Sequence, residues 1–122
     1  MKKNNRQTGT RMEQTAARWL ESQGAQILEQ QYRSRHGEID LIYQEDGQLV
    51  FGEVKFRTTE RYGSPADAVD LRKRQRLVYT AETYILQHGL QNVPVRFDVI
   101  EMTEQNGQLY IRVLRDAFRP GE

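Results

Sequence analysis

The sequence predicts one α/β domain built around a mixed sheet, with its elements in the order helix, three strands, helix and two strands. Two dipeptides, Asp46-Gly47 and Asn106-Gly107, are strong signals for tight hairpin turns, and each lies between apolar runs. Two longer segments have helical periodicity. The second of these lies between the hairpins, and a long helical crossover favours a parallel return to the sheet.

The chain has 122 residues, which is long enough for one hydrophobic core and short for two. We expect a basic N-terminal arm without fixed structure at residues 1–9 and a single domain over residues 10–118. The sequence has no cysteine, no run of about 18 apolar residues and no apolar segment after its basic start. These absences predict a cytoplasmic protein with no membrane partner, no disulfide bond and no thiolate metal site.

The first helix is expected from Thr10 to about Gln23, with a stop at Gly24. Thr10-Arg11-Met12-Glu13 fits a capping box. The helix is expected to bury Ala16, Ala17 and Leu20, with Trp19 beside them. Residues 25–33 are expected to form the first strand, and residues 38–57 the first hairpin.

The second helix is expected to open at Ser64-Pro65-Ala66-Asp67, with serine at the N-cap and proline at the first helical position. It should end near Gly89. Its buried stripe is expected to be Val69, Leu77, Ala81 and Tyr84 or Ile85. Strands over Val95–Met102 and Leu109–Leu114 complete the sheet as a second hairpin.

The first turn predicts which charged residues face each other. If Asp46-Gly47 is a two-residue loop, Asp40 lies opposite Glu53, and both point to the same face of the sheet. Like charges directly opposite are destabilising, so we interpret this pair as ligands of one cation. Oxygen donors without histidine or cysteine suit Mg²⁺ or Mn²⁺, as in a metal-dependent phosphodiesterase centre. The alternative is a solvated acidic face. The metal role is favoured over it because the neighbouring positions are apolar.

The same register places Lys55 opposite Glu38, on the face that carries Glu53. A lysine beside a metal site can hold the attacking water or offset charge on the phosphate. The alternative is an exposed ion pair with Glu38, and both can hold if Glu38 orients the lysine.

Two residues in the expected helices each have two possible roles. Glu13 completes the capping box but also lies on the buried stripe, where a carboxylate needs a metal or a lysine. Spacing alone slightly favours the cap. Lys73 lies on the inward face of the second helix, where it reaches either a phosphate or solvent.

A further charged group, Arg96, Asp98 and Arg115, is interpreted as a structural ion-pair cluster, because the second hairpin places Asp98 opposite Arg115. His36 and His88 have no partner at ligand spacing and receive no function. Basic residues gather in clusters that suit either a phosphate backbone or an ordinary solvated surface. The residues expected to contact nucleic acid are Lys2, Lys3, Arg6, Arg57, Arg61, Arg72, Lys73 and Arg76.

This set resembles the PD-(D/E)xK nuclease superfamily. Ile39-Asp40 stands where proline-aspartate gives the motif its name, and Glu53-Val54-Lys55 matches its second half. The chain more closely resembles the YraN family of predicted bacterial endonucleases, relatives of archaeal-type Holliday-junction resolvases. The matching segments are Gly9 with Glu13 and Ala16-Ala17, residues 37–42, residues 50–57, Lys73 and residues 95–99.

The resemblance implies a restriction-endonuclease-like sheet with flanking helices. It also implies Asp40 and Glu53 as metal ligands, Lys55 as catalytic lysine and Glu13 as the helix glutamate that completes the site. At Gly52 a larger residue would be equally expected.

The first hypothesis is therefore a Mg²⁺- or Mn²⁺-dependent endonuclease acting on structured or branched DNA. A homodimer is expected, because a pair of symmetric cuts needs two active centres. The second hypothesis is a non-catalytic module that binds nucleic acid or a partner on a nuclease-like scaffold, which would have no need of adjacent carboxylates. A glycosidase with two carboxylates is a distant third, because it leaves Lys55 and the basic clusters unexplained.

Overall fold

The computed structural model describes the backbone of residues 5–57 and 70–121 and the side chains of residues 10–57 and 70–121. The elements follow the predicted order. They are α1 (Asn5–Ser22), β1 (Gln26–Ser34), β2 (Gly37–Glu45), β3 (Gln48–Arg57), α2 (Leu71–His88), β4 (Val95–Gln105) and β5 (Gln108–Phe118). Neither of these helices is long and apolar enough to cross a membrane.

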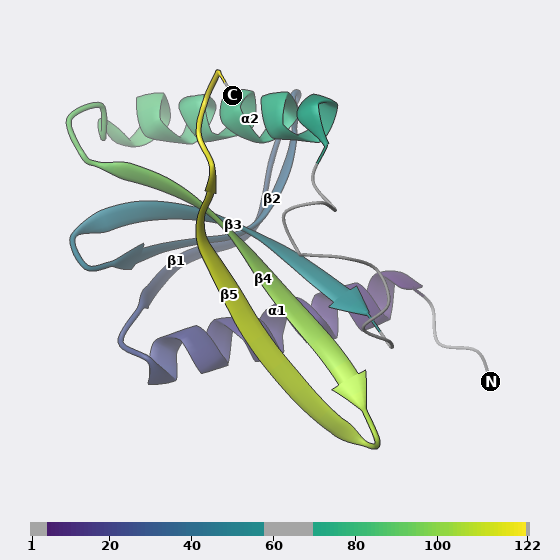
Figure 1. Cartoon of the computed structure of the whole chain (residues 1–122). Coiled ribbons are helices and arrows are strands. Elements are labelled where there is room, and N and C mark those ends of the chain that lie inside the picture. The colour runs from purple at the N-terminus through teal and green to yellow at the C-terminus, as the bar shows by residue number, and fades with distance from the viewer. Residues whose placement is uncertain (1–4, 58–69, 122) are drawn as a thin grey trace.

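The strands form one five-stranded sheet in the order β1-β2-β3-β4-β5. The β3–β4 pair is parallel and the other pairs are antiparallel, so the predicted mixed sheet is confirmed. Figure 1 shows the two helices on opposite faces of this strongly twisted sheet. The helical crossover through α2 explains the parallel pair, because it returns the chain to the same end of the sheet.

Each helix covers its own hydrophobic core. On one face, Ala16, Ala17 and Leu20 of α1 pack with Leu41 and Tyr43 of β2. On the other face, the residues of α2 and of the sheet that pack together include Leu77, Ala81, Tyr84, Ile42, Phe51 and Phe97. The predicted stripes of both helices are thus confirmed for the described residues.

The start of α2 differs from the prediction. The helix begins at Leu71, and its N-cap is Asp70, whose carboxylate accepts a hydrogen bond from the backbone N–H of Lys73 at 2.9 Å. The predicted opening at Ser64-Pro65-Ala66-Asp67 and the predicted core residue Val69 lie outside the described residues. At the other end, Gly89 adopts the left-handed conformation expected of a C-terminal stop, with φ of 64°.

Gly52 is favoured by close packing, which corrects the expectation that a larger residue is equally expected there. A Cβ atom there would lie 2.8 Å from Ile100 Cδ1 and 3.1 Å from Tyr43 Cε1. We predict that Gly52→Ala lowers the free energy of unfolding by about 1–3 kcal/mol. Urea denaturation would measure this loss.

The control for this prediction removes the obstructing atom. Ile100→Val deletes Cδ1. The double variant should therefore lose less free energy of unfolding than the two single variants lose in sum. Strict additivity would show that the contact with Ile100 is not the cause.

A buried ion network holds the turn end of β2 against β4 and β5. Arg96 donates to Asp98 at 2.8 and 2.9 Å and to Glu45 at 2.7 Å. Asp98 also accepts from the Tyr43 hydroxyl at 2.9 Å, and Arg115 donates to Glu45 at 2.9 Å. The predicted structural cluster is confirmed with one correction. A register shift between Phe97 and Val99 breaks the pairing of Asp98 with Arg115, so Arg115 joins through Glu45 instead.

Removing the central cation of this network should be costly. Arg96→Met leaves Asp98 and Glu45 buried with less counter-charge, and we predict a loss of about 3–5 kcal/mol in the free energy of unfolding at pH 7. Tyr43→Phe is the matched control, since it removes one neutral donor to Asp98 and should cost only about 1 kcal/mol. Similar losses in the two variants would argue against the electrostatic role of Arg96.

Candidate metal centre

The candidate site lies where the backbone pairing of β2 with β3 stops. The predicted hairpin register is confirmed from the turn as far as Leu41 and Gly52. Beyond this pair β2 stays beside β1, and β3 stays beside β4. Figure 1 shows the consequence, a fork in which β1 and β2 rise toward α2 while β3 and β4 run to the opposite side.

The side chain of Asp40 lies at the point where β2 and β3 separate. The carboxylate of Asp40 accepts a hydrogen bond from the backbone N–H of Val54 at 2.8 Å. In an unbroken ladder that N–H would point at a backbone carbonyl of β2. Asp40 therefore replaces the next ladder contact, and the predicted backbone pairing of Asp40 with Glu53 does not form. The two carboxylates nevertheless line the same pocket.

The position of Glu38 shows that a second part of the predicted register is wrong. It lies opposite Arg33 of β1, and its carboxylate accepts a hydrogen bond from the Arg33 Nε–H group at 2.9 Å. Both side chains are exposed. The expected Glu38–Lys55 pair is absent, because β2 has already left β3 at this point.

Glu13 reaches the fork from α1. The helix begins at Asn5, so Thr10 lies within it and the predicted capping box is wrong. Glu13 is buried on the sheet side, and its carboxylate accepts a hydrogen bond from the side-chain amide of Gln31 at 2.6 Å. One carboxylate oxygen from each of Glu13, Glu38 and Asp40 lies within 4.8 Å of the others.

Gln31 is a site residue that the sequence analysis missed. Its backbone has φ of 54°, in the left-handed region that a residue with a side chain rarely adopts. The same amide nitrogen that donates to Glu13 also donates to the Thr10 hydroxyl at 3.1 Å. A strained residue that holds a carboxylate in place is typical of functional sites. Nothing in the run Glu29-Gln30-Gln31 signals this role.

Glu53 lies in the same pocket but is paired with lysines. Its Oε1 atom is 2.7 Å from the Nζ atom of Lys73 and 3.8 Å from that of Lys55. Lys73 comes from the first turn of α2, whereas Lys55 is two residues further along β3. The predicted ligand set of Asp40, Glu53 and Glu13 thus converges in part, since Glu38 rather than Glu53 completes the close group of three carboxylates.

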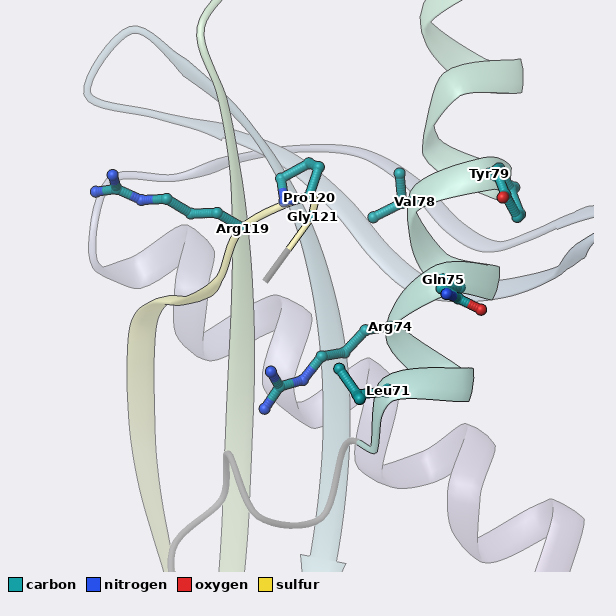
Figure 2. Close-up of a pocket in the computed structure, with 8 residues that line it drawn as sticks. All are labelled: Leu71, Arg74, Gln75, Val78, Tyr79, Arg119, Pro120 and Gly121. Carbon is teal, nitrogen blue, oxygen red and sulfur yellow. The ribbon is translucent and has the colours of Figure 1, made fainter.

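The pocket at the fork has a volume of about 280 Å³, and its lining includes Glu38, Asp40, Glu53, Lys73 and Arg76. A larger hollow of about 410 Å³ lies between α2 and the C-terminal segment. Figure 2 shows that its lining combines Leu71, Val78 and Tyr79 with the arginines Arg74 and Arg119. None of the described residues that line it is a carboxylate or a lysine. The smaller pocket therefore carries the candidate chemistry.

Burial and neighbouring carboxyl groups raise the pKa values of the acids in this site. Burial raises the pKa of Asp40 from 3.8 to about 7, and the neighbouring Glu13 carboxyl acts in the same direction. Burial also raises the pKa of Glu53, with a further contribution from the charge of Asp40 and an opposing one from Lys73. For Lys55, burial lowers the pKa. The site thus favours a proton or another cation on its acids.

The donor set fits a hard divalent cation. Mg²⁺ and Mn²⁺ prefer carboxylate oxygens, and Mg²⁺ commonly uses only a few protein carboxylates together with water and substrate phosphate. Glu13 and Asp40, from two different elements, lie close enough that they could share such an ion. Glu38 and Glu53 flank them on β2 and β3.

Apart from Lys73, which pairs with Glu53, the predicted nucleic-acid contacts divide into three groups. Arg72 and Arg76 are exposed on α2, and Arg76 lines the pocket at the fork. Arg57 lies 3.9 Å from Glu101, an acid that Arg112 also contacts. Lys2, Lys3, Arg61 and the side chain of Arg6 lie outside the described residues.

The raised pKa of Asp40 predicts a pH-dependent stability. Between pH 4 and 7 the metal-free folded protein holds a proton on Asp40 that the unfolded chain has released. Stability should therefore fall as the pH rises through this range, and Mn²⁺ should restore it above pH 7. Thermal denaturation of the metal-free protein between pH 5 and 8 would measure the decline.

The matched variant for this prediction is Asp40→Asn, which cannot titrate. It should flatten the pH dependence and remove most of the stabilisation by Mn²⁺. An unchanged slope in this variant would show that Asp40 is not the titrating group.

Comparisons with known proteins agree with the resemblance seen in the sequence. A family model described as "Uncharacterised protein family UPF0102" matches residues 12–102. A UPF0102 protein of Lachnoclostridium phytofermentans is 41% identical over 116 residues, which cover 94% of this chain and 95% of the relative. A UPF0102 protein of Symbiobacterium thermophilum is 43% identical over 114 residues, covering 93% and 97%. The chain therefore belongs to the UPF0102 (YraN) family.

Proposed function

We propose that this protein is a metal-dependent endonuclease that hydrolyses phosphodiester bonds in structured or branched DNA, with Mg²⁺ or Mn²⁺ as cofactor. The observation that carries this proposal is the convergence at the fork. Carboxylates from α1 and β2 crowd together beside a buried glutamate that has two lysines at one oxygen. A sheet surface without a ligand would gain nothing from such crowding.

Each residue has a role that follows from its position. Asp40 and Glu13 would hold the ion, with Glu53 or Glu38 completing its ligands. A bound divalent ion would polarise the scissile phosphate and lower the pKa of a bound water. Lys55 lies beside Glu53 with a depressed pKa, so its amine can orient the attacking water or stabilise charge on the phosphate.

DNA is the proposed polymer because basic side chains surround the acids. Arg72 and Arg76 are exposed on α2, and we propose that they contact the phosphate backbone. Lys2, Lys3, Arg6, Arg57 and Arg61 are the further proposed contacts. A homodimer is proposed as the form that makes paired cuts in a branched substrate.

The test is cleavage of linear, flapped and four-way DNA with Mg²⁺ or Mn²⁺. We predict that Asp40→Asn and Lys55→Ala each reduce the rate by at least about 100-fold. Asp46→Asn is the matched control, because it makes the same chemical change on the turn at the other end of the hairpin. Asparagine accepts the positive φ of 53° found there.

Two outcomes would contradict the proposal. Binding of DNA without cleavage of any substrate would favour the non-catalytic scaffold. Cleavage that survives both site substitutions would remove the assignment of the fork as the active centre.

A further inference from the structure

Glu53 is a buried carboxylate that already has a cation. Its side chain is 7% exposed, and Lys73 makes the short contact with it at 2.7 Å. A buried carboxylate without a partner is strongly destabilising, so this ion pair neutralises Glu53 in the metal-free protein.

The two lysines at Glu53 are not equivalent. Lys55 stands further from Oε1, at 3.8 Å, and belongs to the same strand as Glu53. Lys73 comes from α2, and its side chain is the more exposed of the two, at 37% against 25%. A divalent cation that takes Glu53 as a ligand competes with the lysines for this carboxylate. Lys73, whose side chain is the more exposed, is the one that can move its ammonium out toward solvent.

We propose that Lys73 is a displaceable counter-ion: it neutralises Glu53 until a divalent cation binds, then moves its ammonium onto a phosphate of the DNA. This inference rests on the proposed metal-dependent function. Lys73 is accordingly a counter-ion of Glu53 in the metal-free state and a phosphate contact in the complex.

The geometry of α2 allows this exchange without a backbone movement. The backbone of Lys73 is fixed in the first helical turn by the cap at Asp70, while four rotatable bonds carry its ammonium. The pocket that contains the ion pair is also lined by Arg76, one turn further along the same helix. The released ammonium would therefore lie beside Arg76 on the basic side of α2, where a phosphate is expected to bind.

The first test measures metal affinity without catalysis. We would titrate Mn²⁺ into wild-type protein and Lys73→Met at pH 8, following binding by calorimetry and by the electron paramagnetic resonance of free Mn²⁺. Removing a competing cation should tighten Mn²⁺ binding by about three- to tenfold. Methionine keeps an unbranched apolar stem, and Lys73→Gln serves as a second variant if Lys73→Met is unstable.

The matched control is Arg76→Met, which removes one positive charge from the same pocket and helix. The guanidinium of Arg76 is exposed and well screened, so its removal should change Mn²⁺ affinity by less than about twofold. Equal tightening in both variants would show a general effect of charge and would overturn the specific role of Lys73.

The second test follows the other half of the exchange. Binding of four-way DNA is measured with and without Ca²⁺ as a non-catalytic stand-in for the metal. Ca²⁺ should strengthen DNA binding more in the wild type than in Lys73→Met, because only the wild type releases an ammonium to the phosphate. An equal gain in both proteins would overturn this step.

The outcomes separate the two proposals. Wild-type protein that binds no Mn²⁺ at millimolar concentration would overturn the proposed metal-dependent function itself. Normal binding by the wild type with unchanged or weaker binding by Lys73→Met would overturn only the present inference. Weaker binding would mean that Lys73 orients Glu53 as a ligand and does not compete with the ion.

Discussion

The hydrogen bond from the Val54 N–H group to the Asp40 carboxylate is the contact on which the site depends. It places a side chain where the ladder would place a backbone carbonyl, and the pairing of β2 with β3 ends there. At this point Glu13 of α1 lies close to Asp40, and Lys73 of α2 contacts Glu53, although the two helices cover opposite faces of the sheet.

The same strands are held firmly at their other end. Glu45, at the last position of β2, and Asp98 of β4 share the guanidinium of Arg96, so the turn end of the sheet is closed by buried charge pairs. Replacing buried ion pairs by apolar residues often stabilises a protein, and such a network therefore argues for geometry more than for stability. A sheet that is fixed at one end can be forked at the other without losing its register.

Sequence reasoning succeeded where a local rule fixes the geometry. The Asp46-Gly47 turn correctly predicted the hairpin register as far as Leu41 and Gly52, and the apolar stripes correctly predicted the cores. It failed where a side chain replaces a backbone partner, because no turn rule signals that Asp40 would accept from Val54. Gln31 could not be found either, since its role depends on a positive φ and on a helix 18 residues away in sequence. The capping box failed because Thr10 and Glu13 fit that motif equally well inside a longer helix.

The metal-free site balances its negative charge in two different ways. The pKa of Asp40 is about 7, so a proton neutralises this carboxyl in about half of the molecules at pH 7, whereas an ammonium neutralises Glu53. In the proposed function, a divalent cation that used both carboxylates would release this proton to solvent and displace the lysine, and both steps would weaken its apparent affinity. The displaced lysine stays on the helix that carries the exposed Arg72 and Arg76, so the lost contact can be regained on a phosphate. Metal and DNA would thus each bind more tightly when the other is present, because the metal displaces the ammonium from Glu53 and a DNA phosphate binds it.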